Sequence, residues 1–202
     1  RWSIDEVYGM HNWPGAPVGS FSIRAGAFFA ATDQFDIVIE GKGGHAAKPQ
    51  ETVDSTLVAA HCVTALQSIA SRNADPVDQI VVSVTSIESS SKAFNVIAQR
   101  VALKGTVRTM SKGMRDLAEK RLKEICDGVC ATFGATAEVT YYRGYPSMVN
   151  HEEQTEFAAK VATDVSGDCT EAPIVMGGED FAFMLEERPG AYILVGNGDS
   201  AS

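Results

Sequence analysis

Residues 34–41 read Gln-Phe-Asp-Ile-Val-Ile-Glu-Gly, and this stretch has an apolar side chain at every second position. The side chains on the apolar face are Phe35, Ile37 and Ile39. Asp36 and Glu40 fall on the other face. Because successive side chains of a strand point to opposite sides, the pattern predicts a strand with one buried face. Gly43 and Gly44 are expected to end it.

Two amphipathic helices and three further strands are predicted after this strand, in the order helix, strand, strand, helix, strand. Their apolar spacing places them at residues 58–69, 80–84, 101–107, 114–133 and 137–141. Thr52, Asp54 or Ser55 is expected to cap the first helix, and Gly134 to end the second. Residues 86–92 are polar and predict a loop between the second and third strands.

The order β-α-β-β-α-β is that of a ferredoxin-like domain, an antiparallel sheet with two helices on one face. We assign residues 22–145 to this domain. The flanks, residues 1–21 and 146–202, alternate short apolar strands with helices, including a helix over 151–165. Such alternation is typical of a parallel α/β sheet. The predicted fold class is therefore α/β, with a small α+β domain inserted into part of a larger α/β domain.

The composition excludes some classes of partner. The 202 residues carry a net charge of −9 and have a pI near 4.9. An acidic surface repels phosphates, so we expect no nucleic-acid partner. No apolar run approaches the roughly 18 residues of a membrane span, and the first residues lack the features of a signal peptide. We therefore expect no membrane partner.

The four cysteines are Cys62, Cys126, Cys130 and Cys169. Cys126 and Cys130 fall on the apolar face of the second predicted helix. Neither has further cysteines or histidines at the spacing of a metal site. We interpret them as buried thiols, which fit a reducing compartment and predict a cytoplasmic protein.

His11 lies at the end of a short apolar strand, before the turn Trp13-Pro14-Gly15. A neutral imidazole at a strand end suits zinc, cobalt, nickel or manganese. The alternative is a hydrogen-bonded histidine packed near Trp13. The residue alone does not decide between them.

His45 and Asn95 are candidates for carbonyl activation. His45 follows Gly43 and Gly44 in a loop between a strand and a helix, where glycine allows close approach of a backbone or a ligand. Such a histidine can donate a hydrogen bond to a developing oxyanion, but it could equally cap the following helix. Asn95 is a polar residue among apolar ones at the entrance to the third strand.

Arg108 leaves the third strand on the face opposite the helices. A guanidinium there could hold a carboxylate with two parallel hydrogen bonds. A solvated strand arginine is the alternative. Glu179 and Asp180 lie at the start of a predicted helix, where an acidic side chain stabilises the helix terminus.

Six motifs, taken together and in this order, resemble the metal-dependent aminoacylase and hippurate hydrolase family, which is related to the di-zinc carboxypeptidases. They span residues 9–19, 41–49, 94–98, 105–109, 177–182 and 195–199. The resemblance implies that His11 is a metal ligand. It implies that His45 and Asn95 polarise the scissile carbonyl, and that Arg108 contributes to the substrate carboxylate site.

The resemblance also implies hydrolysis of N-acyl amino acids by a protein that binds one or two divalent ions, Zn, Mn, Ni or Co. The inserted domain would form a homodimer, and its Gly-Gly-His loop would reach the partner's active site. The family's first metal motif and base glutamate would precede residue 1, and a last histidine ligand would follow residue 202. The 202-residue chain alone is therefore expected to be inactive and to bind metal poorly.

Two other functions fit parts of the sequence. A dimeric ferredoxin-like module could bind a small ligand without catalysis, although such a module has no use for residues 9–19 or 177–181. A dipeptidase or carboxypeptidase relative could use the same residues, and only substrate tests would separate it from an amidohydrolase.

Overall fold

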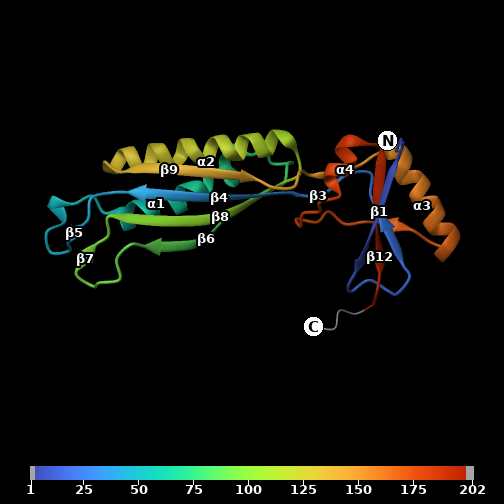
Figure 1. Ribbon diagram of the computed structural model, residues 1–202, viewed down its shortest axis with the longest axis horizontal. Coiled ribbons are helices and arrows are strands. Elements are labelled where there is room, and N and C mark those ends of the chain that lie inside the picture. Colours follow the sequence, from blue (N-terminus) through green and yellow to red (C-terminus); the bar gives the residue numbers. More distant parts are fainter. Residues whose placement is uncertain (1–2, 199–202) are drawn as a thin grey trace. The chain divides into compact units, whose positions relative to one another are not determined.

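The computed structural model describes residues 3–198. The chain forms two compact units. The first unit contains the chain up to Ala31 and from Tyr145 onward, and the second is Thr32–Gly144. Sheets and helices are present in both, so the protein has a mixed α/β fold (Figure 1).

The second unit has a four-stranded sheet in the order β6-β8-β4-β9. Helices α1 and α2 pack together over one buried face of this sheet (Figure 1). A separate two-stranded ribbon, β5-β7, extends from the same unit. The elements of the second unit are β4 (Ala31–Glu40), β5 (Gly44–His45), η1 (Pro49–Glu51), α1 (Ser55–Leu66), η2 (Ile69–Asn73), β6 (Ile80–Ser89), β7 (Val96–Ile97), β8 (Arg100–Thr109), α2 (Lys112–Phe133) and β9 (Thr136–Arg143).

The local sequence explains these elements. The apolar side chains Phe35, Ile37 and Ile39 of β4 are almost completely buried, as their alternation predicts. Asp54 caps α1, and its carboxylate accepts hydrogen bonds from the backbone N–H groups of the first helical turn. Gly134 ends α2 in the left-handed conformation, with φ +76°, where a glycine has no steric penalty.

One prediction in this unit is wrong. Residues 86–89, expected to belong to a polar loop, continue β6 as far as Ser89. A register shift between Val84 and Ser86 keeps the strand paired with β8 beyond the point where its apolar alternation ends. Backbone pairing, which composition does not reveal, extends the strand.

The first unit has a four-stranded sheet in the order β1-β12-β2-β11 and a small sheet, β10-β3. Strands β1 and β12 are parallel, whereas β12 and β2 are antiparallel. The sheet is therefore mixed, not the purely parallel sheet that the alternating strands and helices predict. The elements of the first unit are β1 (Val7–Trp13), β2 (Phe21–Ile23), β3 (Gly26–Phe29), β10 (Met148–Asn150), α3 (Glu152–Ser166), β11 (Thr170–Glu171), α4 (Ala182–Glu187) and β12 (Gly190–Gly196).

The division between the units differs from the predicted domain boundary at residue 22. Strand β2 pairs with β12 and β11, and β3 pairs with β10, so residues 21–29 join strands of the first unit. The second boundary, after Gly144, lies within one residue of the predicted one. Of the predicted flanks, residues 1–2 and 199–202 lie outside the described part of the chain.

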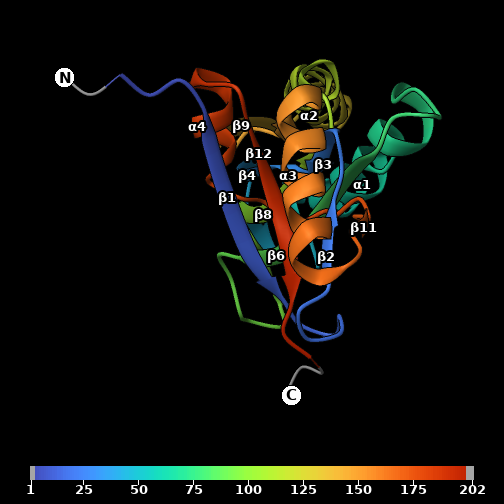
Figure 2. The ribbon, with the colours of Figure 1, turned by 90° about the vertical axis from the view of Figure 1, so that its right-hand side faces the viewer.

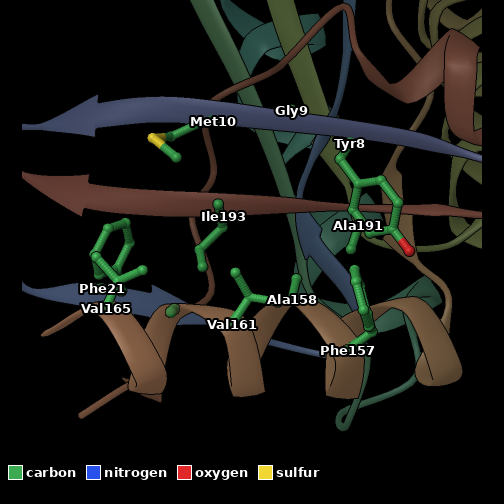
Figure 3. A pocket seen from close by; sticks show the side chains of 11 residues that line it. Tyr8, Gly9, Met10, Phe21, Phe157, Ala158, Val161, Val165, Ala191 and Ile193 are labelled. Atoms are coloured by element: carbon green, nitrogen blue, oxygen red, sulfur yellow. The ribbon is translucent and has the colours of Figure 1, made fainter. Parts of the chain in front are cut away.

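Helix α3 runs along β12 and β2 on one face of the first unit's sheet (Figure 2). An open groove of about 440 Å³ lies between α3 and β1. Phe157, Val161 and Val165, the apolar face of the predicted helix, line this groove together with Tyr8 and Met10 (Figure 3). The three helix side chains are 58%, 46% and 73% exposed, so they lie at the border of the core instead of inside it.

The cysteines of the second unit are buried, as predicted. Cys62, Cys126 and Cys130 all belong to its core, and Cys169 of the first unit is partly exposed. All four are free thiols. Among residues 3–198, no helix combines the length and the apolar character that crossing a membrane requires.

Candidate functional site

His11 is half-buried on β1, in an aromatic environment. Its ring meets the edges of Trp13 and Tyr192, with ring centroids 5.9 Å and 6.5 Å away. Phe29 packs in turn against both of these aromatic rings. Because β1 is paired with β12 along its whole length, the backbone position of His11 is fixed.

The tautomer of His11 follows from its hydrogen bond. Nδ1 lies 2.5 Å from the carbonyl oxygen of Asn12. A carbonyl can only accept, so Nδ1 carries the proton and donates it. In the neutral ring Nε2 is then an unprotonated lone pair, the form that binds a metal ion.

Tyr192 and Glu179 form part of the same environment, and the sequence did not single out this pair. The Tyr192 hydroxyl donates to Oε2 of Glu179 at 2.8 Å. Burial, together with the neighbouring carboxylate, raises the pKa of Tyr192, so the phenol keeps its proton. Oε1 of Glu179 accepts a longer hydrogen bond from the backbone N–H of Phe181, just before α4. Glu179 therefore contacts the start of the helix, as expected, and in addition binds Tyr192.

Gly9 is the sequence feature that could have revealed this packing. A Cβ at position 9 would lie 2.5 Å from the Tyr192 ring and 3.0 Å from Phe181. Glycine inside a strand often marks the close approach of another group. Because Gly9 has no side chain, the ring of Tyr192, whose hydroxyl binds Glu179, can lie against the strand.

His45 is exposed on β5, in a loop that is held by backbone contacts. A Cβ on Gly43 would lie 2.9 Å from backbone atoms of Ile97 and Gln99. The Gln99 side chain accepts from the Gly43 N–H at 3.0 Å and donates to the Gly41 carbonyl at 3.0 Å. The glycines therefore let the loop pack against the neighbouring backbone.

His45 has the opposite tautomer to His11. The backbone N–H of Ala47 donates to Nδ1 of His45 at 3.1 Å. This nitrogen must be unprotonated to accept, so in the neutral ring the proton is on Nε2. His45 thus presents an N–H donor to its surroundings, as the oxyanion role requires.

Asn95 lies beside His45. Strands β5 and β7 pair antiparallel, with His45 opposite Val96, and the Ala46 N–H donates to the Asn95 carbonyl at 2.9 Å. Asn95 occupies the turn before β7, outside the third strand of the sheet, and its side chain is exposed. The β5-β7 ribbon therefore brings together two residues that are 50 positions apart in the sequence.

Arg108 lies on β8, on the sheet face opposite α1 and α2, in an open hollow of about 390 Å³. Strand β8 begins at Arg100, close to the ribbon, and Arg108 is near its other end. Eight residues of strand span about 26 Å. The β5-β7 ribbon lies beyond one end of the sheet (Figure 1), and Arg108 is near the end of β8 that is remote from the ribbon.

Among the described residues, His11 is the metal ligand that the sequence predicts. Its free Nε2 suits a ligand, but within residues 3–198 no group of three or more His, Cys, Asp or Glu side chains could hold an ion. A metal site built on His11 needs ligands from elsewhere in the whole protein.

Comparison with known proteins identifies the family. The model of peptidase family M20/M25/M40 matches residues 1–202. N-acetyldiaminopimelate deacetylase of Shouchella clausii is 38% identical over 196 residues, covering 96% of this chain and 52% of the relative. N-acetylcysteine deacetylase of Bacillus subtilis is 34% identical over 193 residues, covering 96% of this chain and 50% of the relative.

A solved structure agrees with this assignment. The YXEP protein of Bacillus subtilis, described as a dinuclear metal binding peptidase of family M20, has a TM-score of 0.79 and 30% identity. The match covers 96% of this chain and 48% of that protein. The chain belongs to the M20/M25/M40 peptidase family, and it spans about half the length of the curated relatives it matches.

Proposed function

We propose that the full-length protein is a metal-dependent amidohydrolase that cleaves the amide bond of N-acyl amino acids. One or two divalent ions, Zn, Mn, Ni or Co, would bind at a site that includes His11. Support comes from the family membership and from the presence of deacetylases of N-acetyl amino acids among the relatives. The described chain would supply one ligand, the carbonyl-polarising pair and the carboxylate-binding arginine.

The observation that carries this proposal is the pair of opposite histidine tautomers. His11 exposes a lone pair at Nε2, and His45 exposes an N–H. A bound divalent ion lowers the pKa of a water molecule and polarises a carbonyl. Amide hydrolysis needs both such an ion and hydrogen-bond donors for the oxyanion.

His45 and Asn95 would donate to the carbonyl oxygen of the substrate as negative charge develops on it. The Nε2–H of His45 and the side-chain amide of Asn95 are both donors, and both residues are exposed at one end of the ribbon. Arg108 would bind the carboxylate of the amino-acid part. In a single subunit, Arg108 is separated from the strand end near the other two residues by eight residues of β8, about 26 Å.

That separation supports a composite site in a homodimer. We infer that Thr32–Gly144 is a ferredoxin-like dimerisation domain, which its β-α-β-β-α-β order and its sheet order favour. Strand β6 is at the edge of the sheet, where Val81 and Ile87 are 38% and 57% exposed. An apolar strand edge is a surface on which a second copy can pair.

A peptidase is the second candidate, because the YXEP protein is described as one. A dipeptide, like an N-acyl amino acid, has an amide next to a free carboxylate. It adds an α-amino group, which an N-acyl amino acid lacks.

The test is hydrolysis of hippurate, N-acetyl amino acids and dipeptides by the full-length protein. Turnover of N-acyl amino acids that is lost on chelation and returns with zinc, manganese, nickel or cobalt would support the proposal. Turnover of dipeptides alone would favour the peptidase. No turnover of either class, with metal bound, would leave the binding module as the better function.

A further inference from the structure

The guanidinium of Arg108 is held through one of its three nitrogens. Nη1 donates to the carbonyl of Val107 at 3.0 Å, to the carbonyl of Asp33 at 3.4 Å and to the hydroxyl of Thr106. Within residues 3–198, neither Nε nor Nη2 of Arg108 has a hydrogen-bond acceptor. The Nε/Nη2 edge, one of the two edges that can take a carboxylate with two parallel bonds, is therefore free.

Thr106 has a defined orientation in this arrangement. Its hydroxyl donates its one proton to the Asp33 carbonyl at 2.9 Å. Its lone pairs then face Nη1 of Arg108 and accept from it. The hydroxyl thus links β4 to β8 and fixes the rotation of the guanidinium.

The carboxylate of Asp33, whose main-chain carbonyl takes part in this link, does not pair with Arg108. The carboxylate of Asp33 is almost completely buried and binds Arg115, with Nη2 2.6 Å and Nε 2.9 Å from its oxygens. It also accepts from the Tyr141 hydroxyl at 2.8 Å and from the Gly144 N–H at 3.0 Å. Asp33 therefore offers Arg108 only its main-chain carbonyl, and within residues 3–198 Arg108 forms no salt bridge, although Asp36 lines the same hollow.

We propose that Thr106 is a positioning residue for Arg108: with the Asp33 carbonyl it fixes Nη1 and presents the Nε/Nη2 edge to the carboxylate of the ligand. The inference rests on the proposed role of Arg108 and deepens it by naming the edge that binds and the group that orients it. A held guanidinium binds more tightly because less side-chain entropy is lost.

The test compares Thr106→Val with the wild type in the full-length protein. Valine keeps the branched shape and the strand preference of threonine but removes the hydroxyl. We expect the Kd for hippurate, measured by titration calorimetry, and its KM to rise about tenfold, with kcat nearly unchanged, as for loss of one ordered hydrogen bond. Hippuramide, which lacks the carboxylate, should bind both proteins equally.

Two further variants separate positioning from a structural effect. Thr106→Ser restores the hydroxyl and should restore hippurate affinity. Thr140→Val, on an exposed position of the same sheet face, should leave Kd and KM unchanged. Equal weakening of hippurate and hippuramide, or no change in Thr106→Val, would overturn the inference.

The outcome is independent of turnover. Hippurate binding that depends on Thr106 in a protein without hydrolytic activity would uphold the positioning role and refute the amidohydrolase. Hydrolysis by the wild type, together with normal hippurate affinity in Thr106→Val, would uphold the amidohydrolase and refute the positioning role. Failure of the wild type to bind hippurate or any N-acetyl amino acid would overturn both.

Discussion

Each of the two units has a histidine whose Nδ1 forms a hydrogen bond with a nearby backbone group, but one Nδ1 donates and the other accepts. In the first unit, Nδ1 of His11 donates to a carbonyl, and the ring is packed among aromatic side chains on a paired strand. In the second, Nδ1 of His45 accepts from a backbone N–H on an exposed ribbon. One contact per ring therefore decides whether Nε2 offers a lone pair or a proton.

The difference also concerns rigidity. A metal ligand needs a fixed direction, which the strand and the aromatic rings around His11 provide. A residue that donates to a substrate bound in the partner subunit has to be accessible, and its position on the exposed ribbon makes His45 accessible. The environment of each histidine matches the role proposed for it, and substitution of each histidine tests its role separately.

The largest effect is expected for His11→Ala in the full-length protein. We expect kcat/KM to fall by more than about 10³-fold, since losing a group that merely supports a metal ligand already costs about 10–100-fold. Metal content, measured by mass spectrometry, should fall with it. His61→Ala, a histidine stacked on Phe133 in the second unit, is the control and should keep both. Full metal content in His11→Ala would remove it from the ligand set.

His45→Ala should lower kcat by about 10²–10³-fold, the usual loss of one oxyanion donor. In contrast to His11→Ala, metal content and thermal stability should stay at wild-type values, because the exposed ring contributes little packing. His45→Gln keeps an N–H donor and should retain more activity than the alanine variant. Unchanged turnover in His45→Ala would exclude the residue from the site.

Mixing these two inactive variants sharpens the comparison. If the site is composite, a heterodimer of His11→Ala and His45→Ala subunits contains one site in which both histidines are intact. Random pairing then restores roughly a quarter of the wild-type activity. No recovery after verified subunit exchange would place both histidines in one subunit.

Much of the second unit could be predicted from local pattern. The alternation in residues 34–40, the Asp54 cap and the terminating Gly134 act over a few residues, and the structure shows each of them. The continuation of β6 to Ser89 was missed because it depends on pairing with β8 across a register shift. The mixed sheet of the first unit was missed for a similar reason: β2 pairs with β12, some 170 residues away.

The candidate site was only partly accessible from the sequence. The structure places His45 and Asn95 side by side, but their proximity depends on a long-range ribbon that no periodicity reveals. The Tyr192–Glu179 contact required knowledge of the packing around Gly9. The burial of Asp33, in contrast, is predictable from the sequence. It follows the same alternation as Phe35 and Ile37, which places its side chain on the buried face of β4.

Asp33→Ala tests how strongly that buried carboxylate holds the second unit together. Removing it leaves Arg115, whose side chain is only 11% exposed, without its partner. We expect a loss of about 3 kcal/mol in the free energy of unfolding, seen as faster hydrogen exchange in β9 and α2 of the full-length protein. Asp127→Ala breaks an exposed pair with Lys123 and should cost less than about 1 kcal/mol. Equal effects of the two substitutions would contradict a structural role for Asp33.

Phe94→Ala should have the smallest effect on stability. Phe94 is fully exposed next to Asn95, so its ring is solvated in both the folded and the unfolded chain, and its loss should change the free energy of unfolding by less than about 0.5 kcal/mol. The matched change Phe35→Ala, in the core of the same unit, should cost about 3–5 kcal/mol. Denaturant unfolding of the two variants measures both values. A cost above about 1.5 kcal/mol for Phe94→Ala would mean that its ring is covered in the assembled protein. The ribbon carrying His45 and Asn95 would then be docked against another surface instead of standing free, and the contrast with the packed environment of His11 would be lost.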